Sequence, residues 1–160
     1  MGGNVYEFLP PTSLYIREVN MSKKKEIGFT NLTKIQPITE HQKEVFESWK
    51  KNKNQFLFGC AGTGKTFISL YLALQDVLKN DTPYDKVVVV RSLIPTREIG
   101  FLPGDEEDKA ALYQVPYSNM MQFMFEQPNE QAFSMLYDRL KAQGSFYFLS
   151  TSFLRGLTFD

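Results

Sequence analysis

The sequence has few of the residues that build disulfide frameworks and metal centres. Among its 160 residues, cysteine and histidine occur once each, as Cys60 and His41. One cysteine cannot form an internal disulfide, which fits a reducing compartment, and one histidine without a CxxC pair does not make a zinc site. We therefore expect a surface role for His41 and no metal ion held by protein side chains alone.

Long apolar runs and an excess of one charge are missing as well. No run approaches the ~18 apolar residues of a membrane span, and the first residues lack the basic and then apolar pattern of a signal peptide. The 18 basic residues balance the 18 acidic ones, so net charge gives no reason to expect a nucleic-acid partner. These features predict a cytoplasmic protein without a membrane partner.

The composition that remains is that of an ordinary globular protein, with 42% hydrophobic and 22% charged residues. A chain of this length forms one domain with a core of its own. Residues 1–35 contain Pro10, Pro11 and a lysine run, so we interpret them as an irregular arm with one short strand near residues 14–16. Residues 36–160 then form the core.

One stretch of eight residues matches the phosphate-binding pattern GxxxxGK[ST], the Walker A motif, at every fixed position. It consists of Gly59, Cys60, Ala61, Gly62, Thr63, Gly64, Lys65 and Thr66. The glycines can take positive φ and let backbone N–H groups approach phosphate oxygens. The lysine supplies a charge to the β- and γ-phosphates, and the threonine hydroxyl can complete a Mg²⁺ shell. The motif predicts a nucleotide site with Mg²⁺.

The sequence on both sides of the motif fits its usual setting, in which a strand precedes the loop and a helix follows it. Residues 55–58 form a short apolar run that we interpret as a buried strand. Residues 67–78 are rich in helix-compatible apolar residues and contain neither Gly nor Pro. Both conditions for a phosphate-binding loop are therefore met.

A second candidate contact to the nucleotide lies before the motif. Thr39 is the predicted N-cap of a helix with Val45, Phe46 and Trp49 on its inner face. Gln42 is the third residue of this helix, where it can close a capping box with Thr39. Its amide can equally present donors and an acceptor to the edge of an adenine ring. Spacing alone leaves both interpretations open.

Two runs rich in β-forming residues predict a parallel sheet. Residues 87–90 are four valines, as expected for a parallel strand covered on both faces, and residues 145–150 form a second strand. The first run ends in Arg91. Ligands gather at the carboxyl ends of strands in open α/β sheets, so Arg91 is a candidate site residue, with pairing to a nearby carboxylate as the alternative.

The segment between these strands carries signals for turns and helices. Pro103 and Gly104 fit a type II turn, and the acidic residues 105–108 favour a helix start over an acid–base pair. We expect Pro116 to break this helix. The apolar patch at residues 120–125 is interpreted as core or interface packing, and a helix with apolar residues at 133, 136 and 140 ends at Gly144.

Three separated blocks together resemble one family. The motif at residues 59–66 is followed by Arg91 and by a Gly-Phe-Leu-Pro-Gly block at 100–104, and Arg155 then opens an Arg-Gly-Leu-Thr block at 155–158. With these blocks in this order, residues 35–160 resemble the phosphate-starvation-inducible PhoH family, especially its compact phage-encoded members.

The resemblance implies a RecA-like, helicase-related P-loop ATPase of the α/β class, with a parallel sheet flanked by helices. Such proteins are often RNA-associated and often assembled as homo-oligomeric rings. It also implies that Gln42 reads adenine, that Lys65 and Thr66 bind ATP and Mg²⁺, and that Arg91 and Arg155 are the motif arginines. Arg155 would reach the γ-phosphate of a neighbouring subunit. A phage-encoded member would act in the host cytoplasm.

The chain departs from the family pattern in places. Ser92 follows Arg91 where many members have proline. The acidic Walker B pair expected after the Arg-Gly-x-Thr block, and the nuclease domain of some relatives, do not occur before the sequence ends at Asp160. We therefore expect a core that is incomplete at its C-terminus and that, alone, binds nucleotide weakly and hydrolyses it poorly.

These observations favour an ATPase that couples hydrolysis to remodelling of RNA or another nucleic acid. A small-molecule kinase on the same loop is the first alternative; it would need an arginine-rich lid, and residues 93–144 contain only Arg97 and Arg139. The second alternative is a nucleotide-dependent interaction module with little turnover.

Overall fold

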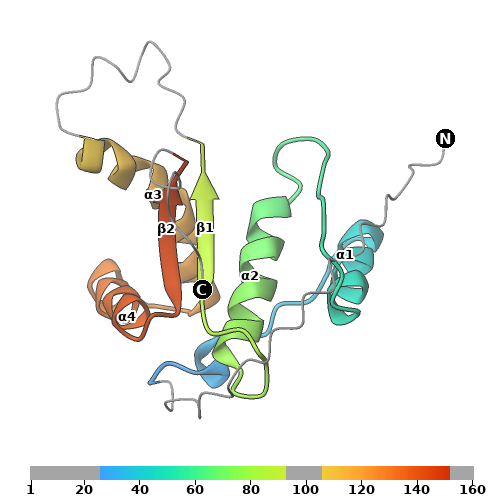
Figure 1. Cartoon of the computed structure of the whole chain (residues 1–160), viewed down its shortest axis with the longest axis horizontal. Helices are drawn as coiled ribbons and strands as arrows, with labels where there is room; N and C mark the ends of the chain where they lie inside the picture. Colours follow the sequence, from blue (N-terminus) through green and yellow to red (C-terminus); the bar gives the residue numbers. More distant parts are fainter. Residues whose placement is uncertain (1–25, 93–105, 152–160) are drawn as a thin grey trace, which may run out of the picture.

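The computed structural model describes residues 26–92 and 106–151 of the chain (Figure 1). The fold is α/β, with helices packed around a small parallel sheet. In chain order the elements are η1 (Phe29–Asn31), α1 (Glu40–Lys50), α2 (Lys65–Leu78), β1 (Val87–Arg91), α3 (Glu106–Met124), α4 (Glu130–Ala142) and β2 (Phe146–Ser150). None of the described helices is long and apolar enough to cross a membrane.

The two predicted strands form and pair with each other in parallel. Val87 lies opposite Phe146, and the register continues to Arg91 opposite Ser150. A parallel pair needs a long crossover connection, and here α3 and α4 provide it. Both sheet predictions are confirmed, and the pairing places the carboxyl end of β1 on the same side of the molecule as the loop that enters α2 (Figure 1).

The core is built around α2, which lies between α1 and the sheet (Figure 1). Leu74 on α2 is fully buried, as are Met121 and Leu140 from the later helices and Phe146 from β2. The predicted helix at residues 67–78 is confirmed and begins two residues earlier. Its apolar residues occupy most of its circumference, as expected for a helix covered by neighbours on several sides.

The first helix is confirmed together with its inner face. Val45, Phe46 and Trp49 pack against the core. The Phe46 ring lies 6.2 Å from the ring of Tyr71 on α2. The indole Nε1 of Trp49 donates to Asp76 Oδ2 at 2.6 Å. These contacts fix α1 along the side of α2.

The predicted buried strand at residues 55–58 is wrong for the described part of the chain. These residues form no ladder, and Phe56 and Phe58 are 87% and 78% exposed. Gln55 and Leu57 instead face a groove whose opposite wall is β1. The side chains therefore alternate as in a strand, but a strand also needs a neighbouring backbone, and the groove separates this segment from β1.

The expected break at Pro116 is also wrong, because α3 continues through it. A proline inside a helix removes one hydrogen bond and costs about 3 kcal/mol. Packing after the proline offsets this cost: the Tyr117 ring lies 5.4 Å from Phe148, and Met121 and Met124 are fully buried. Local chain chemistry predicted the break, and tertiary contacts decide against it.

Other predictions for residues 105–144 are confirmed. The helix start at residues 105–108 is confirmed, since α3 begins at Glu106. The apolar patch at 120–125 is largely core, with the exception of Phe123, which is 66% exposed. The helix expected to end at Gly144 does so, and Gly144 has a φ of 75°. The predicted turn at Pro103 and the strand near residues 14–16 lie outside the described residues.

Residues 26–35 run along the base of the helices as an irregular segment. The side chain of Gln143 binds both backbone groups of Ile27, accepting from its N–H at 3.1 Å and donating to its carbonyl at 3.2 Å. Thr33 N–H donates to the carbonyl of Met124, and Ile35 N–H donates to the Tyr71 hydroxyl. This segment leads the chain into α1.

Candidate nucleotide-binding site

The loop before α2 is shaped by glycines in conformations that other residues avoid. Gly62 and Gly64 have φ of 78° and 82°, and Gly64 is the N-cap of α2. A side chain at either position would be strained, which explains in physical terms why the motif requires glycine there. The loop thereby turns the chain from residues 55–58 into the first turn of α2.

The backbone amides of this loop are available to an anion. The N–H groups of Gly62 and Gly64 donate no hydrogen bond to any residue that the structure describes. The first N–H groups of α2 point to the same end of the helix, where the helix dipole is positive. This arrangement of donors is the kind that binds phosphate oxygens at helix N-termini.

Lys65 places its charge over the loop. Its Nζ donates to the carbonyls of Gly59 at 3.1 Å and Cys60 at 2.5 Å, and lies 3.2 Å from Thr63 Oγ1. The lysine is therefore folded back onto the loop, where carbonyl dipoles balance its charge. The Cys60 side chain is exposed. A phosphate group at this loop would offer Lys65 a full negative charge in place of the carbonyls.

Thr66 follows Lys65 and is exposed at the start of α2. Its hydroxyl is a hard oxygen ligand of the type that Mg²⁺ takes. Among the described residues, no group of three or more His, Cys, Asp or Glu side chains is placed to hold a metal ion. The carboxylate of Asp76, about 15 Å further along α2, is bound by Trp49 and lies 3.6 Å from Lys79 Nζ. The residues present fit a Mg²⁺ that is carried by phosphates and held through Thr66.

Gln42 closes the capping box and also reaches the loop. Its N–H donates to Thr39 Oγ1 at 3.3 Å, and its Oε1 accepts from the N–H groups of Ile38 at 2.8 Å and Thr39 at 3.4 Å. Its Nε2 lies 3.6 Å from the position that a β-carbon would take at Gly64. The cap uses Oε1 of the Gln42 side chain alone. The two N–H groups on Nε2 therefore remain directed at the loop, without a partner among the described residues.

Arg91 ends β1 near the same side of the molecule. Its Nη1 lies 3.5 Å from the carbonyl of Tyr113, and its guanidinium lies 5.0 Å from the centre of that ring. In the described part of the chain it pairs with no carboxylate, which was the alternative to a site role. Arg155 lies outside the described residues.

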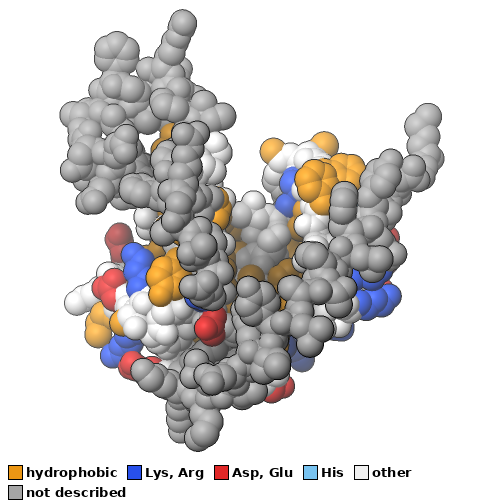
Figure 2. Space-filling model, in the orientation of Figure 1, with side chains coloured by type: hydrophobic (Ala, Val, Ile, Leu, Met, Phe, Trp, Pro, Cys, Tyr) orange, Lys and Arg blue, Asp and Glu red, His pale blue; other side chains and the backbone are white. Residues whose placement is uncertain are grey.

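A groove of about 700 Å³ runs beside the loop. Lys65 and Thr66 line one end of it, Gln55 and Leu57 form one wall, and β1 forms the other. Figure 2 shows the molecule hollowed between the loop that enters α2 and β1. The sequence did not predict this groove, because it exists only where residues 55–58 stay apart from β1.

Comparison with known proteins places the chain in a family. The family model described as PhoH-like protein matches residues 34–160, so the chain belongs to the PhoH family. A PhoH-like protein of Synechocystis sp. is 34% identical over 92 residues, which are 56% of this chain and 27% of that protein. A PhoH-like protein of Bacillus subtilis is 27% identical over 158 residues, which are 91% of this chain and 47% of that protein.

Protein PhoH2 of Bacillus subtilis is 37% identical over 70 residues, which are 43% of this chain and 16% of that protein. The chain thus spans less than half the length of each of these relatives. No solved structure gives a significant match.

Proposed function

We propose that this chain binds ATP with Mg²⁺ at residues 59–66 and forms the nucleotide-binding part of a RecA-like ATPase. The observation that supports this most is the loop itself. Its free amides, the positive-φ glycines Gly62 and Gly64, and the charge of Lys65 converge at the N-terminus of α2. In this proposal the phosphates take the place of the loop carbonyls around Lys65, and the Thr66 hydroxyl holds Mg²⁺.

The preference for ATP would come from Gln42. Its Nε2 donors face the loop while its oxygen holds the cap, so the amide is positioned before the nucleotide arrives. At its Watson–Crick edge adenine has an acceptor at N1, where guanine has an N–H donor, so an N–H donor from Gln42 at this edge favours adenine. We place Arg91 at the γ-phosphate end, because it lies at the carboxyl end of β1.

Turnover requires more than binding. Bound Mg²⁺ would neutralise the developing charge of the phosphoryl group, and an acidic residue would have to position the attacking water. Asp76 is held by Trp49 and Lys79. We therefore propose that the chain alone binds ATP better than it hydrolyses it. In an assembled homo-oligomer, Arg155 would reach the γ-phosphate of a neighbouring subunit and complete the site.

Coupling of hydrolysis to RNA or another single-stranded nucleic acid is the further part of the proposal, and it is supported by family membership. The test measures phosphate release from MgATP by the purified chain, with and without single-stranded RNA. Stimulation by RNA supports the proposal. ATP consumption only when a small-molecule acceptor is added would identify a kinase. Binding without turnover even when RNA is present would favour an interaction module over the RNA-coupled ATPase.

A further inference from the structure

Phe123 is exposed although its neighbours in α3 are buried. The residue is 66% exposed, whereas Met121 and Met124 are fully buried. Its ring meets the ring of Phe67 edge-on, with centroids 5.9 Å apart and an interplanar angle of 61°. Phe67 therefore fixes the orientation of the ring, and much of its surface stays open to solvent. An aromatic ring held in this way offers a flat surface for stacking.

The position of Phe67 brings this ring next to the proposed nucleotide site. Phe67 lies in the first turn of α2, two residues after Lys65. The Gln42 amide approaches the same turn through Gly64. The Phe123 ring and the Gln42 amide thus both lie against the end of α2 at which phosphate would bind.

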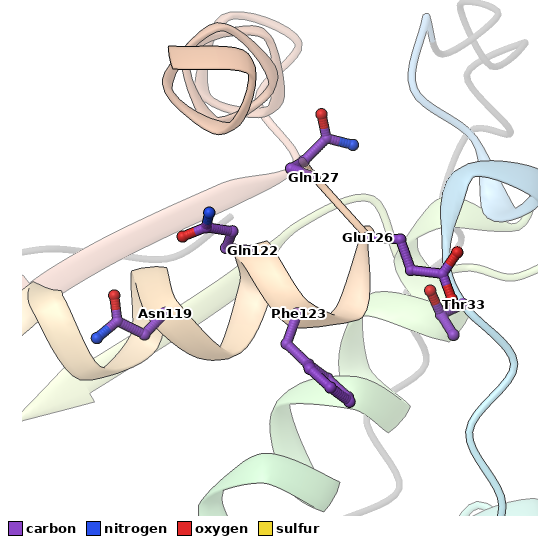
Figure 3. Close-up of a pocket in the computed structure, with 6 residues that line it drawn as sticks. All are labelled: Thr33, Asn119, Gln122, Phe123, Glu126 and Gln127. Atoms are coloured by element: carbon purple, nitrogen blue, oxygen red, sulfur yellow. The ribbon is translucent and has the colours of Figure 1, made fainter. Parts of the chain in front are cut away.

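A pocket of about 470 Å³ opens at Phe123. In Figure 3 the ring points from α3 toward α2, Asn119 and Gln122 extend on one side of it, and Glu126 lies beside Thr33 on the other. The side chains that line the pocket include amides, a hydroxyl and one carboxylate, but no cation. Such a lining suits an uncharged heterocycle with its own donors and acceptors, and it does not suit a phosphate group.

We propose that Phe123 stacks on the base of the nucleotide whose phosphates bind at residues 59–66. The inference rests on the proposed function and adds a base-binding residue to it. Phe67 lies about 3 Å along the helix axis from Lys65, and its ring centre lies 5.9 Å from that of Phe123, a span that the ribose between base and phosphates can bridge. Stacking on an aromatic ring tolerates any base, so Phe123 contributes affinity while Gln42 discriminates between bases.

The test titrates the wild-type chain and Phe123→Ala with MgATP, MgGTP and magnesium tripolyphosphate, which has no base. Phe123→Ala is expected to lose about 5- to 100-fold in affinity for both nucleotides and to keep its affinity for tripolyphosphate. Phe123→Trp, which keeps an aromatic ring at this position, is expected to bind both nucleotides with about wild-type affinity. Met135→Ala removes another exposed apolar side chain, on α4, and should change none of the three affinities.

Each contrary result has a distinct meaning. Equal MgATP affinity of the wild type and Phe123→Ala would overturn the inference and leave the phosphate site intact. An equal loss of affinity for ATP and for tripolyphosphate would overturn it too, because the ring would then not act through the base. If the wild type binds neither ATP nor tripolyphosphate, the proposed function itself fails, and this inference with it.

Discussion

Gln42→Glu should separate the two roles that we assign to Gln42. The cap depends on Oε1, which accepts from the N–H groups of Ile38 and Thr39. A glutamate oxygen can accept both bonds, and glutamate is a common residue at this position of a capping box. Its charge is also favourable in the first turn of a helix. The free energy of unfolding should therefore change by less than about 0.5 kcal/mol, whereas Gln42→Ala should lower it by about 0.5–2 kcal/mol.

Nucleotide preference should respond differently. Glutamate has no Nε2 donors, so neither variant can donate to a ring nitrogen of adenine. The loss of one such hydrogen bond costs about 1–3 kcal/mol, or roughly 5- to 100-fold in affinity. The added charge of Gln42→Glu would weaken ATP and GTP binding alike, so the ratio of the two dissociation constants isolates the contact with the base. Both variants should lose the preference for ATP.

The assay combines urea unfolding with competitive nucleotide binding. Gln36→Glu is the matched control, because it adds the same charge at an exposed position of the segment that leads into α1. This control should keep the wild-type ratio of ATP to GTP affinity. If Gln42→Glu also keeps the wild-type ratio, the amide does not read the base, and Gln42 acts only as a cap.

Three further predictions concern stability and solubility. Burial, and next the charge of Asp138, raise the pKa of Tyr137 above its usual 10.0, so the ionised form is disfavoured in the folded state. The stability that the neutral Tyr137 contributes is complete below pH ~10 and should be lost as pH rises through the folded-state pKa. Urea unfolding at a series of pH values should therefore show a smaller loss of stability at alkaline pH for Tyr137→Phe than for the wild type. Pro116→Ala should restore a helix hydrogen bond and raise the free energy of unfolding by about 1–3 kcal/mol, and an unchanged or lower value would contradict our account of α3. Phe56→Lys should reduce self-association in light scattering, because Phe56 and Phe58 form an exposed aromatic pair; equal scattering by the variant and the wild type would argue against this.

The elements that the sequence predicted well depend on local chemistry. Thr39 and Gln42 define the start of α1 through their own side chains, and Gly144 ends α4 through its positive φ. The loop at residues 59–66 likewise depends on glycines within it. In each case the decisive atoms lie within a few residues of one another, so a short stretch of sequence contains the information.

The predictions that failed depend on distant parts of the chain. Residues 55–58 have the alternation of a strand, but pairing requires a neighbouring backbone, which the described residues do not supply. Pro116 stays within α3 because Tyr117 and Met121 pack against the core. The apolar patch at residues 120–125 indicates core or interface packing, and the sequence could not tell which of its residues, such as Phe123, stay exposed. The exposure of Phe123 becomes evident only when α3 is placed against α2.

The central claim is that Lys65 and its loop bind the phosphates of ATP. Calorimetric titration of MgATP into the wild-type chain and Lys65→Ala tests it, with Lys43→Ala as a control, because Lys43 is an exposed lysine on α1 that pairs with Glu40. The account predicts measurable binding by the wild type and by Lys43→Ala, and a loss of at least about 10-fold in Lys65→Ala with an unchanged melting temperature. Absence of binding by the wild type, or equal affinity in Lys65→Ala, would contradict it.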